Sequence, residues 1–403
     1  MTYVQFKNTT LKIWNEYYSF LSNYIRNDSS FNKAKKNQVF LFPTDIIFTR
    51  SDNHFIAEFF GASKKFNALK YKENKVLTSE EYFYQFSVSD EQKKKVAFLD
   101  FPNLKLTNIV FGIKYDGLDI NKRYPNVDFS SFTKGIQNFI SENVEIPFYF
   151  GEKFETMLIH NTAIFNKKNN YHRFKYILNL SMADKKIDIQ TYEKSLKVEL
   201  EKDVKNHSIV RGIIQCESKE IEKRNLFNQF ANIYSSNYRE TTIGDFLNKN
   251  PDIIKKGLNC DSFLYEQELK WIEGNPDSNE KSIRPDLLLK KKDENLYDIC
   301  DLKLSNKGIT RKKHNRRRLY DYPQDGISQL SNYEDYFKFE ANKSYALDNF
   351  KINTLNPKLY LIVGSYENFN YDEVKEALRS TKENYIMIDY DTLNMKFLFS
   401  KEK

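Results

Sequence analysis

Two hydrophobic runs near the C-terminal end constrain the fold of this chain more than any other feature. Residues 283–289 and 296–304 are rich in Ile and Leu, and the polar segment 292–295 (Lys-Asp-Glu-Asn) lies between them. A short polar segment of this kind favours a hairpin turn, so we expect two neighbouring antiparallel strands. The rest of this region must then build a sheet around that hairpin.

The pattern on both sides of the hairpin alternates between helix and strand. Thr242 is expected to cap a helix that Asn250-Pro251 interrupts and Ile253-Ile254 resume. This order predicts an α/β domain in which a mixed sheet is flanked by helices. The other expected elements are a strand at 263–271, a helix at 327–339, a strand at 359–363, a helix at 371–379 and a strand at 385–389.

The first half of the chain predicts a strand-rich α+β region. Short β-branched or aromatic runs are separated by Asn, Asp, Gly and Lys, as strand boundaries require. The chain has 33 Phe and 27 Tyr, and we interpret the aromatic residues of this half as core packing rather than base stacking. The runs are residues 39–42, 46–48, 55–60 and 109–113.

Residues 191–231 change to a helical pattern, with Tyr192, Leu196, Leu200 and Val204 at four-residue steps among Glu and Lys. A solvated connector is the simpler interpretation, and packing against a partner subunit is the alternative. The predicted organisation is a regulatory or sensing domain at 1–190, a helical connector at 191–234 and a third domain at 235–403.

Charge, cysteine count and hydropathy narrow the class of protein. The 63 basic and 55 acidic residues give a net charge of +8, which is too mild to identify a partner. The three cysteines are too few and scattered for a disulfide framework or a zinc site. The N-terminus lacks the apolar run of a signal peptide, and no segment approaches the roughly 18 apolar residues of a membrane span. We therefore expect a cytoplasmic protein without a membrane partner.

We also expect three isolated histidines to be ordinary residues rather than metal ligands: His54, His160 and His172.

Three of the polar residues in the hydrophobic hairpin form a candidate group. Asp286 follows Pro285 at the start of one strand, and Asp301 and Lys303 lie near the end of the other. Residues two apart on a strand share a face, so Asp301 and Lys303 point the same way, and hairpin pairing brings Asp286 close to Asp301. Two carboxylates suit Mg²⁺ or Mn²⁺, which would stabilise charge on a phosphate. Lys303 would then orient water or neutralise that charge, and a role as base would require a lowered pKa.

Two further features accompany this hairpin. The segment between Leu304 and Tyr320 has no acid, and we interpret it as a contact for the DNA backbone, with a solvated loop as the alternative. Gln329 and Tyr333 are one helical turn apart, so their side chains share a face. The basic residues of the segment are Lys307, Arg311, Lys312, Lys313, Arg316, Arg317 and Arg318, with His314 among them.

Pro285-Asp286, Asp301-x-Lys303 and Gln329-x3-Tyr333 resemble the PD-(D/E)xK restriction-endonuclease-like superfamily. With the run from Glu240 to Pro251 added, residues 235–400 resemble the nuclease domain of Shedu (SduA), a single-protein bacterial anti-phage defence system. The resemblance implies a restriction-endonuclease-like core and a Mg²⁺-dependent endonuclease acting on double-stranded phage DNA. It also implies a homo-oligomer, with a tetramer favoured.

The resemblance further implies roles for individual residues. Asp286 and Asp301 correspond to metal ligands, Lys303 to the catalytic lysine and Gln329 to a residue lining the site. Glu240 corresponds to an upstream acid, although Glu266 or Glu268 remain alternatives. Asp301 stands where many relatives carry Glu, and the shorter side chain changes the distance to a metal. Two other functions remain open: a non-catalytic nucleic-acid-binding or scaffold protein, and a restriction enzyme that reads a defined sequence.

Overall fold

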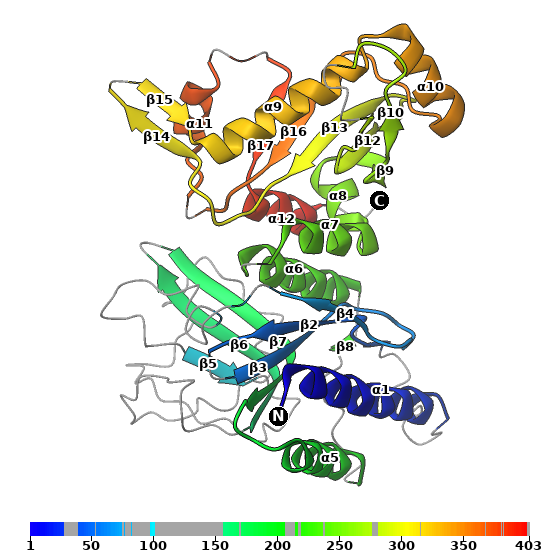
Figure 1. Ribbon diagram of the computed structural model, residues 1–403, viewed down its shortest axis with the longest axis vertical. Coiled ribbons are helices and arrows are strands. Elements are labelled where there is room, and N and C mark those ends of the chain that lie inside the picture. The colour runs from blue at the N-terminus through cyan, green and yellow to red at the C-terminus, as the bar shows by residue number, and fades with distance from the viewer. Residues whose placement is uncertain are drawn as a thin grey trace. The chain divides into compact units, whose positions relative to one another are not determined.

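The protein is described by a computed structural model, in which the chain forms two compact units, Met1–Asn232 and Ile233–Lys403 (Figure 1). The division falls within a helix, α6 (Lys219–Ser235). No helix among the described residues is long and apolar enough to cross a membrane. The structure describes residues 1–27, 39–74, 76, 82, 97–100, 156–205, 214–216 and 219–400, with gaps at 53, 169–170, 237, 276–280, 315, 367, 380 and 382.

The first unit contains a six-stranded sheet in the order β4-β2-β3-β7-β6-β5, and a separate pair of strands, β1 and β8. This agrees with a strand-rich α+β region, although the strand expected at 109–113 lies outside the described residues. The elements are α1 (Tyr3–Asn27), β1 (Val39–Leu41), β2 (Asp45–Arg50), β3 (His54–Phe60), β4 (Lys70–Glu73), β5 (Ala97–Asp100), β6 (Thr156–Lys168), β7 (Tyr171–Asp184), α5 (Ile189–Lys205) and β8 (Ile214–Cys216).

The long first helix, α1, was not expected from the sequence. Its buried face is aromatic, and Phe6, Trp14 and Tyr18 have no or almost no exposed surface. These rings contact Phe48 and Phe59 of the sheet at centroid distances of 4.9 to 6.2 Å. Aromatic rings bury much area each, so this contact stabilises the first unit. The interpretation of these aromatic residues as core is confirmed.

The segment expected to be a helical connector is divided into α5 and α6, with the short strand β8 between them. Tyr192, Leu196 and Leu200 of α5 are buried in the same core as α1. Their four-residue spacing therefore marks the packed face of a helix within the first unit, rather than a solvated connector. Packing of one helix face against a core explains why a region with so many charges is helical.

The second unit is built on a five-stranded mixed sheet in the order β17-β16-β13-β12-β9. The elements are α7 (Glu240–Lys249), α8 (Asp252–Gly257), β9 (Cys260–Tyr265), β10 (Leu269–Lys270), β11 (Ser282–Ile283), β12 (Leu287–Lys291), β13 (Tyr297–Leu302), β14 (Thr310–Lys313), β15 (Arg316–Leu319), α9 (Asp321–Tyr336), α10 (Glu340–Phe350), β16 (Leu359–Ile362), α11 (Tyr371–Ala377), β17 (Tyr385–Ile388) and α12 (Tyr390–Phe399). β12 is antiparallel to both β9 and β13, whereas β13, β16 and β17 run parallel. Figure 1 shows α9 on one face of this sheet and α7, α8 and α12 on the other. The expected α/β arrangement, a mixed sheet flanked by helices, is confirmed.

The central hairpin forms as the sequence indicates. β12 and β13 are antiparallel, and Leu287 lies opposite Cys300 in the register. Asp293, in the turn, has a φ of 58°, a left-handed conformation that Asp tolerates better than most residues. Every residue of β13 is buried, because helices cover both faces of the sheet. Polar groups on this strand are therefore held away from bulk water.

Several element boundaries differ from the expected ones. Thr242 lies inside α7, which begins after Arg239, so it is not the helix cap. Helix α9 begins at Asp321, earlier than expected, and the basic segment before it forms the hairpin β14–β15 rather than a loop. Helices α10 and α12 were not predicted.

A buried asparagine fixes α10 to the rest of the second unit. Oδ1 of Asn342 accepts hydrogen bonds from the backbone nitrogens of Ile272 and Glu273, at 2.8 and 3.1 Å. Its Nδ2 donates to the carbonyls of Glu273 and Tyr336, at 2.9 and 3.0 Å. One fully buried side chain thus binds two other segments of the unit.

The substitution Asn342→Ala is expected to lower the free energy of unfolding by about 3 kcal/mol, because it leaves several backbone groups without partners. Asn349→Ala, an exposed change on the same helix that removes one bond to the Tyr345 carbonyl, is the matched control and should cost under about 1 kcal/mol. Urea titration of both variants measures the difference. Equal losses would show that the Asn342 bonds contribute little.

Candidate active site

The hairpin brings two aspartates to the same end of the sheet. Asp286 immediately precedes β12, and the register that pairs Leu287 with Cys300 places it beside Asp301 of β13. Oδ2 of Asp286 accepts a hydrogen bond from the backbone nitrogen of Leu302 at 2.7 Å, which fixes its carboxylate against β13. Asp301 is only 1 % exposed. The predicted proximity of these two carboxyl groups is therefore present.

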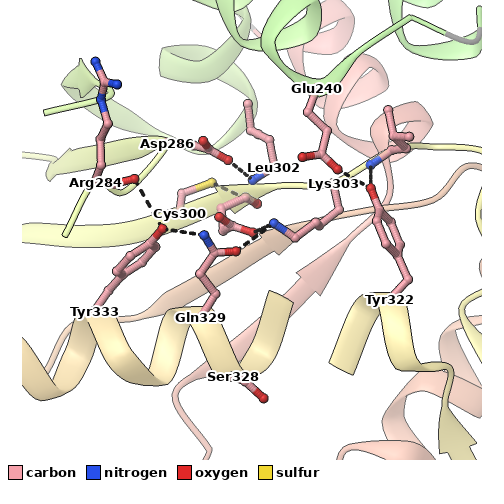
Figure 2. A network of polar contacts seen from close by, with 12 residues as sticks. Glu240, Arg284, Asp286, Cys300, Leu302, Lys303, Tyr322, Ser328, Gln329 and Tyr333 are labelled. Atoms are coloured by element: carbon pink, nitrogen blue, oxygen red, sulfur yellow. Dashed lines mark hydrogen bonds and ion pairs between the residues drawn. The ribbon is translucent and has the colours of Figure 1, made fainter. Parts of the chain in front are cut away.

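Lys303 turns back to the same site. Its Nζ lies 2.6 Å from Oδ2 of Asp301 and donates a hydrogen bond to Oε1 of Gln329 at 2.9 Å. The residue follows the last residue of β13, and its backbone nitrogen still bonds to the carbonyl of Ile362 on β16. The sheet thus fixes the backbone of Lys303, and the side chains of Asp301 and Gln329 contact its amine. Figure 2 shows the contact with Gln329.

Helix α9 carries and orients Gln329, the residue that accepts the hydrogen bond from Lys303. Nε2 of Gln329 donates to the hydroxyl of Tyr333 at 2.7 Å, and this hydroxyl lies 3.2 Å from the carbonyl of Arg284, to which it donates (Figure 2). The one-turn spacing of Gln329 and Tyr333 is what allows the contact. Because Tyr333 takes up the amide nitrogen, the amide oxygen faces Lys303. Gln329 is therefore a positioning residue for the lysine.

A second tyrosine of α9 holds Glu240, at the start of α7. The hydroxyl of Tyr322 donates to Oε1 of Glu240 and accepts from the backbone nitrogen of Leu304 at 2.7 Å (Figure 2). The charge of Glu240 contributes to raising the pKa values of Asp286, Asp301 and Lys303. Glu240 is thus part of the site.

The two other candidate acids have different partners. Glu266 forms an ion pair with Arg284 at 3.5 Å, and Glu268 accepts a hydrogen bond from Ser282 at 2.8 Å. Neither is among the largest causes of the pKa shifts of the two aspartates, whereas Glu240 is. The structure therefore favours Glu240 over Glu266 and Glu268 as the third acid.

Burial and mutual repulsion raise the pKa values of the two aspartates in this site. Burial, followed by the charge of Asp286, raises the pKa of the Asp301 carboxyl to about 7, although Lys303 acts in the opposite direction. Burial also raises the pKa of Asp286, against the hydrogen bond from Leu302. Burial alone would lower the pKa of Lys303, but the neighbouring carboxylates, Asp301 first, raise it above its usual value. Lys303 is therefore held as a cation, which does not favour a role as base.

The donor set fits a hard divalent cation. Oδ1 of Asp301 is buried and accepts no hydrogen bond from any described residue, so this carboxyl oxygen is left without the partner that a buried polar atom requires. Three or more His, Cys, Asp or Glu side chains do not form a ready ligand cluster in the described part of the chain. Mg²⁺ does not require one, because it is usually bound by one or two carboxylates, with water and phosphate oxygens completing the shell.

A polar cleft of about 600 Å³ opens beside Gln329 and Tyr333. Its other lining residues lie on the segment that leads into Asp286 and on α9: Lys281, Ser282, Ile283, Arg284 and Asn332. The cleft meets the site at Gln329, and Asp286, Asp301 and Lys303 are not among its lining residues.

A family model described as "Shedu protein SduA, C-terminal" matches residues 237–393. The C-terminal unit belongs to the SduA C-terminal family. The match covers every site residue of this SduA C-terminal domain and does not extend into residues 1–236. No curated protein sequence matches the chain. Family membership supports the expected part in anti-phage defence.

Within the SduA C-terminal domain, the four residues predicted from the sequence, Asp286, Asp301, Lys303 and Gln329, are brought together at one place. Two tyrosines that position their neighbours were not predicted as site residues. Tyr333 was visible only as half of a Gln-x3-Tyr spacing. Tyr322 gave no signal, because its contacts with Glu240 and Leu304 join segments that are distant in sequence.

Proposed function

We propose that the SduA C-terminal domain is a metal-dependent DNA endonuclease with a PD-(D/E)xK-type core, acting on double-stranded DNA of invading phage. The observation that supports this most is the convergence of Asp286, Asp301 and Lys303 at the end of the central hairpin, with the lysine held as a cation. The expected homo-oligomer, with four subunits by resemblance, is part of the same proposal.

Each residue has a role that follows from its contacts. Asp286 and Asp301 would hold Mg²⁺ or Mn²⁺, with Glu240 adding negative charge nearby. When bound, the cation supplies positive charge beside a phosphate and makes water more acidic. Lys303 donates hydrogen bonds to a phosphate oxygen or to water and offsets the charge that develops there. Gln329 keeps the amine directed toward the carboxylates.

The proposal is tested by incubating the full-length protein with linear and circular duplex DNA, in Mg²⁺, in Mn²⁺ and in EDTA. We expect cleavage of both substrates with either metal and none in EDTA, because two carboxylates and one amine cannot stabilise the transition state without the cation. Cleavage of the circular substrate identifies an endonuclease. Gel electrophoresis resolves the products.

Binding of DNA without cleavage under all conditions would instead support the non-catalytic scaffold. Sequencing the ends produced from a random-sequence DNA pool separates the proposed activity from a restriction enzyme, which would give one recurring sequence at the cut.

A further inference from the structure

The hairpin β14–β15 concentrates positive charge in a way that lowers its own stability. In its register Arg311 lies directly opposite Arg318, and Lys312 opposite Arg317. Like charges in directly opposite positions of an antiparallel pair are destabilising. A hairpin with this sequence therefore needs compensating contacts or an anionic ligand.

Contacts from two helices compensate only one cation of each pair. Arg311 forms an ion pair with Asp321, the first residue of α9, at 2.9 Å. Arg317 forms one with Glu373 of α11 at 2.6 Å. The opposite cations, Arg318 and Lys312, are exposed and have no acidic partner among the described residues.

A cleft of about 600 Å³ lies beside the hairpin and carries an excess of positive charge. Arg316, Arg318 and Arg379 line it and are exposed, without an acidic partner in the described part of the chain. The two acids that line it are Asp321, which is paired with Arg311, and Glu376. Guanidinium groups match phosphate oxygens in geometry and charge, so the cleft suits phosphates.

The hairpin is attached closely to the catalytic residues. Asp321, which holds Arg311, is followed by Tyr322, which holds Glu240 and the backbone of Leu304. The backbone nitrogen of Tyr320 also bonds to the carbonyl of Ile309, which closes the base of the hairpin. The cleft thus has a defined position relative to Lys303, as a substrate-positioning surface requires.

We infer that this cleft binds backbone phosphates of the duplex on one side of the phosphodiester bond that is cut, and that Arg316 and Arg318 are its main contacts. The inference rests on the proposed function, because it names where the substrate of that site is held. It assigns these arginines to DNA binding rather than to the chemical step.

The test compares the full-length protein with the double variant Arg316→Gln/Arg318→Gln. Fluorescence anisotropy with a 30-base-pair duplex in EDTA gives the affinity over a range of KCl concentrations. Removing one phosphate-binding cation should reduce the slope of log affinity against log salt by about 0.9, so the slope of the double variant should be lower by about 2. In Mg²⁺, its KM for DNA should rise at least about tenfold while kcat changes less than about twofold.

The matched control is Lys255→Gln/Lys256→Gln on α8, which removes the same charge elsewhere in the unit and should leave the slope within about 0.5 of wild type. An unchanged slope in the arginine variant would overturn the inference. The inference would also be overturned if a mononucleotide increased the thermal stability of the wild type but not of the variant while the slope measured with the duplex stayed the same. A lower slope in a protein that never cleaves DNA would reject the proposed nuclease and leave the binding surface standing.

Discussion

Replacing Lys303 by Ala is expected to reduce Mg²⁺-dependent cleavage of duplex DNA by about 10³-fold, because the cation nearest to Asp301 is removed from the site. The pKa of Lys303 is raised, so the loss should be similar at every pH between about 6 and 9, where the wild-type amine stays protonated. Initial rates on a linear duplex at several pH values measure both effects.

The same substitution should also change stability. Without Lys303 the buried carboxylate of Asp301 faces Asp286 and Glu240 with no positive charge between them, so we expect a loss on the order of 3 kcal/mol in EDTA. Lys338→Ala, which removes an exposed lysine just after α9, is the control and should leave both activity and stability close to wild type. Wild-type cleavage by Lys303→Ala would show that the proposed site is not the catalytic one.

Replacing Asp301 by Asn is expected to reduce cleavage by about 10³-fold while making the protein more stable in EDTA. Activity should be lost because an amide would not replace the carboxylate that we propose as a metal ligand. Stability increases, by about 1 kcal/mol, because the wild-type charge is buried beside Asp286 and Glu240 and only Lys303 opposes it. A change that abolishes activity and raises stability is expected of a site in which like charges are held together for a ligand.

The stability gained by Asp301→Asn should depend on pH. A carboxyl whose folded pKa is raised to about 7 does not destabilise the fold below its ordinary pKa near 4, and destabilises it increasingly as the pH rises to 7. The advantage of Asp301→Asn over wild type should therefore be largest at pH 8 and narrow steadily toward pH 5. Thermal unfolding in EDTA across this range measures it.

Asp298→Asn, at the other end of the same strand, is the control for this series. Asp298 lies 3.5 Å from Lys291 and accepts a hydrogen bond from the backbone of Lys358, away from the residues of the site. This variant should cleave DNA at the wild-type rate. If Asp301→Asn were less stable than wild type at pH 8, the repulsion inferred among the three acids would be absent.

The central hairpin and its aspartates could be predicted because local rules decide them. A polar turn between two apolar runs favours antiparallel pairing, and the two-residue period of a strand places Asp301 and Lys303 on one side. The spacing of Gln329 and Tyr333 needs only the helical repeat. These features were therefore visible without any knowledge of the tertiary structure.

Other elements follow from contacts that no local rule contains. Helix α1 is rich in aromatic residues, which favour strands by composition, and it is helical because one face packs on the sheet of its unit. The basic segment has no alternation of apolar and polar residues, and its hairpin depends on Asp321 and Glu373 from two helices. Glu240 could not be separated from Glu266 and Glu268 for the same reason.

By itself, therefore, the sequence determined which chemical groups are available, the hairpin that carries them and the family of the C-terminal unit. Only the tertiary structure decided how those groups behave. Burial beneath the helices raised the pKa of Asp301, surrounding carboxylates kept Lys303 charged, and Tyr333 directed the amide of Gln329. The physical reason is that hydrogen-bond geometry and desolvation depend on neighbours that are distant along the chain.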